Sequence, residues 1–103
     1  MLIKLSPNSP KYAEAKAALE GRTAEIAAFL AGLTPKTQLA AINTMYEIRR
    51  GEEFGTGARD TAMIIQTQQN HALDRYGDNL RGLTENQIRT VAADLTRYNA
   101  LQL

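Results

Sequence analysis

The sequence predicts an all-α protein, a compact bundle of about four helices preceded by a short extended N-terminal arm. Apolar residues recur at helical spacing through most of the chain, which places them on one face of each helix. Helix-start signals and glycines separate these stretches. Only six of the 103 residues are aromatic and none is Trp, so Leu, Ile and Ala must supply the core. This length supports one core of three or four helices, and we expect a single domain, 1–103.

The arm is expected over residues 1–9, because its prolines keep the segment from being helical before Pro10. Ser9 followed by Pro10 is a helix-start signal, and the helix beginning there is predicted to run over about 10–31, ahead of Gly32. Gly21 is its weak point and is consistent with a bend. One side carries apolar residues at seven-residue intervals. The other side is nearly all alanine, which lets a second helix approach closely: Ala13, Ala17, Ala24, Ala28 and Ala31.

Three further helices are predicted at about 35–50, 58–76 and 85–101. Thr34 and Pro35 repeat the helix-start signal, and Gly51 follows the second helix as its expected end. In the last helix Thr84 and Gln87 match a capping box, in which each side chain binds a free backbone N–H group of the first turn.

We interpret 58–76 as the helix around which the others assemble. Its apolar stripe contains Gln69, whereas Met63 and Ile64 point away from that stripe. Such a helix is expected to touch more than one neighbour. Two interpretations of Met63 and Ile64 remain open: they are core if this helix is surrounded on three sides, or they form an interface if they are exposed and contiguous.

Composition narrows the classes of function. The formal net charge is +1, from 12 basic and 11 acidic side chains, which gives no broad surface for a polyanion. The absence of cysteine excludes disulfides and thiolate chemistry and suits a reducing compartment. No apolar run approaches the roughly 18 residues of a membrane span. We therefore expect a cytoplasmic protein that does not enter membranes.

No arrangement of residues predicts catalysis, a metal site or a cofactor. His71 is the single histidine, and helical spacing places no carboxylate to orient it as a base. Glu52, Glu53 and Asp60 lie in or beside a glycine-rich loop, where adjacent carboxylates point in different directions. Carboxylates alone suit zinc poorly. We expect a protein that is not an enzyme.

The segment 26–42 resembles a DNA-binding helix-turn-helix. A first helix with small residues is followed by a turn at Gly32 and by a second helix that begins at Thr34 with polar residues. The resemblance implies a DNA-binding protein that uses residues 26–50. The phosphate and base contacts it implies are Lys36, Thr37, Gln38, Asn43 and Arg50.

The leading hypothesis is a small module that binds another protein, or a second copy of itself, without catalysis. Proteins of this size and composition are often adaptors, subunits of assemblies or inhibitors encoded by phages and other mobile elements. The predicted helix 58–76 has more apolar and amide side chains than the core requires. Such side chains are suited to contacts across a protein interface. The expected interface joins the middle of 58–76 to the end of the preceding helix and its loop: Met63, Ile64, Gln68, His71, Arg49, Arg50 and Phe54.

Overall fold

The computed structural model describes residues 4–52, 59–76 and 81–101, and this part of the chain contains helices and no strand. The all-α prediction is thereby confirmed. Five helices are present: α1 (Pro10–Leu19), α2 (Thr23–Ala31), α3 (Pro35–Glu52), α4 (Arg59–Tyr76) and α5 (Glu85–Leu101). None of the described helices is long and apolar enough to cross a membrane.

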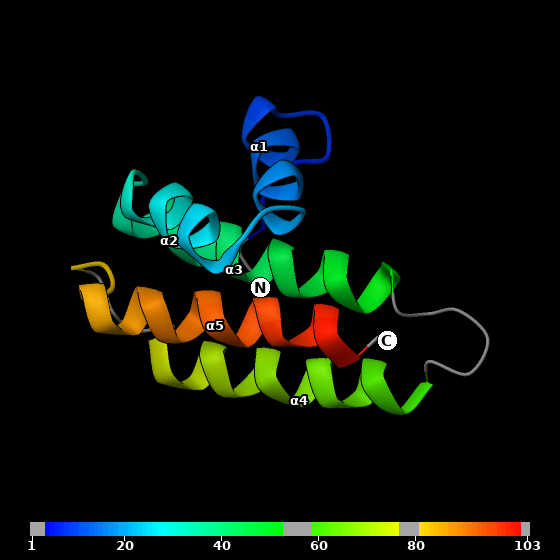
Figure 1. Cartoon of the computed structure of the whole chain (residues 1–103). Coiled ribbons are helices and arrows are strands. Elements are labelled where there is room, and N and C mark those ends of the chain that lie inside the picture. The colour runs from blue at the N-terminus through cyan, green and yellow to red at the C-terminus, as the bar shows by residue number, and fades with distance from the viewer. Residues whose placement is uncertain (1–3, 53–58, 77–80, 102–103) are drawn as a thin grey trace.

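The single helix predicted over 10–31 is wrong, because the chain divides there into α1 and α2. Glu20 ends α1, and the backbone of Arg22 is extended with φ −90° and ψ 170°. The Glu25 carboxylate accepts a hydrogen bond from the Arg22 backbone N–H and so satisfies a free donor at the start of α2. A Cβ on Gly21 would lie 2.5 Å from that carboxylate. The glycine therefore allows the new helix start, and α1 can turn away from α2 (Figure 1).

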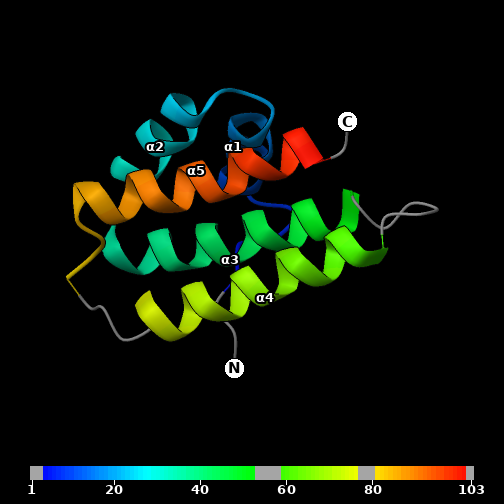
Figure 2. The same cartoon turned by 60° about the horizontal axis from the view of Figure 1, so that its bottom comes forward.

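The central helix is α3, not the predicted 58–76 stretch. In Figure 2, α3, α4 and α5 lie side by side; α3 and α5 run in one direction and α4 runs in the other, and each of the three contacts the other two. The remaining helices, α1 and α2, also contact α3. Residues 40–46 of α3 are consequently all buried. This helix continues through Gly51 to Glu52 instead of ending at residue 50.

The core follows the predicted apolar stripes closely. From α4 and α5 it receives Ile65, Ala72 and Tyr76, and Ile88, Val91, Ala92 and Leu95; from α3 it receives Ala41, Ile42, Met45 and Tyr46. Helices α1 and α2 add Ala15, Leu19, Ile26 and Leu30. The predicted seven-residue spacing of Leu19 and Ile26 survives the break between their helices, since both side chains still reach the same core.

Two buried polar side chains of α3 form hydrogen bonds with backbone groups at the ends of other helices. Gln38 donates to the Leu30 carbonyl near the end of α2 (2.9 Å) and accepts from the Leu83 N–H just before α5 (3.0 Å). Arg49 donates to the carbonyl of Leu19, the last residue of α1, at 2.5 Å. Carbonyls at helix C-termini and N–H groups at N-termini lack partners within the helix. Gln38 and Arg49 therefore fix where those helices start and stop.

A buried amide pair joins α3 to α4. The Gln69 Nε2 atom lies 2.5 Å from Asn43 Oδ1, and Gln69 Oε1 accepts from Arg50 Nη1 at 2.9 Å. Asn43 is completely buried, although the helix-turn-helix resemblance implied that it contacts DNA. Because a buried amide without partners is costly, these bonds select one register of α4 against α3.

The connection into α5 depends on Gly82. Its φ is +89°, a conformation that costs residues with a Cβ about 1–2 kcal/mol. A Cβ at this position would also lie 3.2 Å from both Gln38 Oε1 and Pro35 Cγ. Gly82 thus brings the chain close enough to α3 for Leu83 to bind Gln38.

The amide pair can be tested with Gln69→Met, which keeps the length of the side chain and removes its hydrogen bonds. We expect the free energy of unfolding in urea to fall by about 1–3 kcal/mol, because buried groups of Asn43 and Arg50 lose a partner. The matched control is Gln66→Met, on the exposed side of α4, with an expected change within about 0.5 kcal/mol. Equal effects of the two substitutions would contradict the role of the pair.

Gly82→Ala is expected to lower the free energy of unfolding by about 1–2 kcal/mol, because it combines a positive φ with close contacts to α3. Gly32→Ala is the matched control. Gly32 has φ −84°, and an added Cβ comes no closer than 3.7 Å to its neighbours. The control should be neutral or stabilise by up to about 1 kcal/mol. Thermal unfolding of both variants checks the difference, and equal destabilisation would contradict it.

Candidate functional site

The outward face of α4 carries the large apolar side chains that are exposed in the described part of the protein. Met63 is 65% exposed and Ile64 is 48% exposed. The opposite stripe of the same helix, Ile65, Gln69, Ala72 and Tyr76, is buried against the bundle. Both views place α4 at the edge of the bundle, on the side away from α1 and α2 (Figures 1 and 2). Of the two interpretations of Met63 and Ile64, the structure therefore excludes the core.

A small polar hollow continues this face along the seam between α4 and α5. It has a volume of about 50 Å³, and Gln68, His71 and Arg75 of α4 line it. Ile64, Gln68, His71 and Arg75 follow one another at helical spacing, so they form one stripe beside α5. The structure thus brings Gln68 and His71 together, as predicted, and places them on the same helix face as Ile64.

Sequence reasoning missed Asp94 of α5 and Tyr46 of α3, which line the same hollow. Asp94 brings a carboxylate to the lining shared with His71, which helical spacing on α4 alone could not supply. It follows Val91 by three residues on the inward side of α5. That three-residue spacing from an inward residue is the feature of the sequence from which the position of Asp94 could have been predicted.

Two of the remaining predicted interface residues, Arg49 and Arg50, do not join this surface. Arg49 is only 4% exposed and binds the end of α1, so its prediction as an interface residue is wrong. Arg50 is half-buried, and its guanidinium binds Gln69 and the Glu47 carboxylate within the bundle. Phe54 lies outside the described residues.

The predicted DNA contacts are dispersed. Gln38 and Asn43 are 6% and 0% exposed and bind other helices, so neither is available to a base edge. Thr37 is half-buried and hydrogen-bonded to Thr34. Lys36 is exposed at the start of α3. A recognition helix needs a free face to enter the major groove. As the central helix, α3 is covered by neighbours over most of its length.

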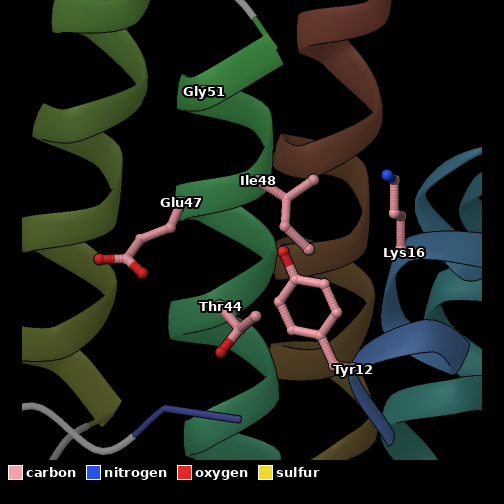
Figure 3. Close-up of a pocket in the computed structure, with 6 residues that line it drawn as sticks. All are labelled: Tyr12, Lys16, Thr44, Glu47, Ile48 and Gly51. Atoms are coloured by element: carbon pink, nitrogen blue, oxygen red, sulfur yellow. The ribbon is translucent and has the colours of Figure 1, made fainter. Parts of the chain in front are cut away.

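Two larger hollows lie on other faces. A cleft of about 350 Å³ separates α1 from α3, and Figure 3 shows Tyr12 and Lys16 approaching it from α1 while Thr44, Glu47, Ile48 and Gly51 line it along α3. A groove of about 970 Å³ runs between α2 and α5, over Ala24, Ala27, Ala28 and Ala31. Three of these alanines belong to the predicted alanine side, and the groove shows that the structure leaves this part of it open.

Among the described residues, no three or more His, Asp or Glu side chains are grouped so that they could hold a metal ion. His71 is exposed. Glu53, one of the loop carboxylates considered for catalysis, lies outside the described residues. Compared with family models, curated proteins and solved structures, the chain matches none.

Two adjacent isoleucines of α4 test which face is outward. Ile64→Asp should change the free energy of unfolding by less than about 1 kcal/mol, because the new charge remains in water. The same substitution at Ile65, which is completely buried, should cost more than about 4 kcal/mol and unfold most of the protein. Circular dichroism during urea titration measures both, and loss of the fold with Ile64→Asp would contradict the outward placement.

Proposed function

We propose that this protein binds another protein through the outward face of α4 and acts without catalysis. The observation that carries the proposal is that the neighbouring residues Met63 and Ile64 are both exposed, while the opposite side of the same helix is buried against the core. Withdrawing such side chains from water contributes roughly 1.5–3 kcal/mol for each that becomes fully buried. A partner that covers both therefore gains a substantial part of its binding free energy from these two side chains.

The polar stripe beside this pair supports a specific interface. Gln68 and His71 present hydrogen-bonding groups one and two turns along from Ile64. Interfaces commonly combine an apolar centre with a polar rim that fixes orientation. In the proposed arrangement Met63 and Ile64 form the centre, and Gln68 and His71 belong to the rim. Adaptor, assembly-subunit and inhibitor roles are all compatible with such a surface, because the fold alone does not decide between them.

Binding is tested with the double variant Met63→Asp/Ile64→Asp. Affinity-tagged protein is incubated with native lysate, and captured proteins are quantified by mass spectrometry. Under the proposal, one or more partners bound by the unmodified protein are reduced at least about tenfold with the variant, since losing two apolar contacts removes more than about 1.4 kcal/mol.

The matched control is Asn86→Asp/Thr90→Asp, which adds the same charges at exposed positions of α5. It should retain the partners. An identical set of captured proteins with all three chains would contradict the proposal. Self-association is followed in parallel by sedimentation at several protein concentrations, and a dimer lost only with the α4 variant would identify a second copy as the partner.

The same sedimentation runs, repeated at low and moderate salt with mixed-sequence duplex DNA, address the helix-turn-helix alternative. A DNA complex that weakens steeply with salt and is lost with Lys36→Glu would favour DNA binding. It would overturn the α4 proposal if Met63→Asp/Ile64→Asp left every interaction unchanged.

A further inference from the structure

The arm and α1 are attached to the bundle by few apolar side chains. Of the ten residues of α1, Ala15 and Leu19 are buried, and both lie in its second half. The arm adds Leu5, which is partly buried against the core. In Figure 1, α1 rises from the bundle crosswise to the three helices that run together. Segments with so little buried apolar area are those that open locally while the rest of a protein stays folded.

Ala18 of α1 is also partly buried against the core, and α1 contacts both α2 and α3. Polar contacts add to these attachments. The Leu5 N–H donates to the Thr44 hydroxyl at 2.8 Å, and Lys4 forms an ion pair with Glu47 at 2.5 Å. Arg49 binds the last carbonyl of α1. All three ties end on α3, at the two ends of the segment 4–19. Between them lies the cleft of Figure 3, where the Tyr12 ring and the Lys16 side chain approach Thr44 and Ile48 without filling the space.

The junction with α2 permits α1 to move separately. The chain changes direction at Gly21 and Arg22, and Glu25 caps the start of α2 from within α2 itself. Helix α2 contacts α1, but it also packs against α5 and α3, and its Thr23 hydroxyl donates a hydrogen bond to Thr96 of α5 at 2.9 Å. The start of α2 therefore has attachments besides α1.

We propose that residues 4–19 form a lid that opens at Gly21 while α2 to α5 remain folded. Opening breaks the ties to Thr44, Glu47 and Arg49 and exposes Ala15 and Leu19 together with the α3 surface at Thr44 and Ile48. The lid is a conformational device built into the fold, and it does not depend on the binding proposed for α4.

The absence of cysteine from the chain makes single-cysteine labelling a direct test. Ala15→Cys and Ala92→Cys place a thiol at two alanines with 0% exposure, one on the buried side of the lid and one in α5. Each variant is labelled with a small maleimide under native conditions and at increasing urea. The thiol reacts when its site opens, so the rate measures the opening equilibrium at that position.

We expect the thiol at position 15 to react at least about tenfold faster than the thiol at position 92. Its rate should also depend less steeply on urea, since local opening exposes less surface than global unfolding. Equal rates with equal urea dependence would overturn the lid. If either cysteine prevents folding, hydrogen exchange of the unmodified chain replaces the test: α1 amides should exchange at least about tenfold faster than those at the centres of α3 and α5.

A second substitution distinguishes local opening of the lid from a general loss of stability of the bundle. Thr44→Val removes the acceptor for Leu5 and should increase labelling at position 15 severalfold. The control is Thr96→Val, which removes a partly buried, hydrogen-bonded hydroxyl from α5 and should leave labelling at position 15 unchanged. The same increase with both variants would overturn the proposal, because it would show that any weakening of the bundle opens α1.

Discussion

The structure depends on the requirement that buried polar groups of α3 find hydrogen-bond partners. Four such residues, Gln38, Asn43, Thr44 and Arg49, lie along one helix that the others surround. Gln38 binds the ends of α2 and α5, and Asn43 binds α4. Thr44 binds the arm, and Arg49 binds the end of α1. Apolar burial is tolerant of small displacements, whereas an unsatisfied buried amide or guanidinium is costly. The polar groups of α3 therefore select the arrangement that the apolar core alone leaves open.

The central position of α3 also determines which surfaces are free. With α1 and α2 on one side, α4 packs on α3 and α5 through a single stripe, and the large side chains beyond that stripe meet water. An exposed Met and Ile side by side form an apolar surface that a partner could cover. The surface proposed for binding on α4 is thus a consequence of where α3 lies. So is the proposed lid, since the three polar ties described for residues 4–19 all end on α3.

Helical periodicity predicted much of the fold because apolar spacing reports directly which side of a helix is buried. The inward residues of α4 and α5, such as Ile65, Tyr76, Val91 and Leu95, were identified in this way. Buried polar residues were not. Asn43 and Arg49 carry polar side chains on a helix expected to have a wet face, and only their partners on other helices reveal that they are inside. The hollow beside His71 escaped prediction for the same reason, since Asp94 reaches it from another helix.

The sequence by itself determined the helical class, the boundaries of the last three helices to within about two residues and most of the core, because these follow from local spacing and capping. Tertiary structure decided the rest. The end of α1 ahead of Gly21 is bound by Arg49 of α3, and the exposure of Met63 and Ile64 depends on α3, not α4, being surrounded. Both outcomes are set by contacts between elements. Local spacing specifies the face that a helix buries, but it does not specify how many neighbours will cover the others.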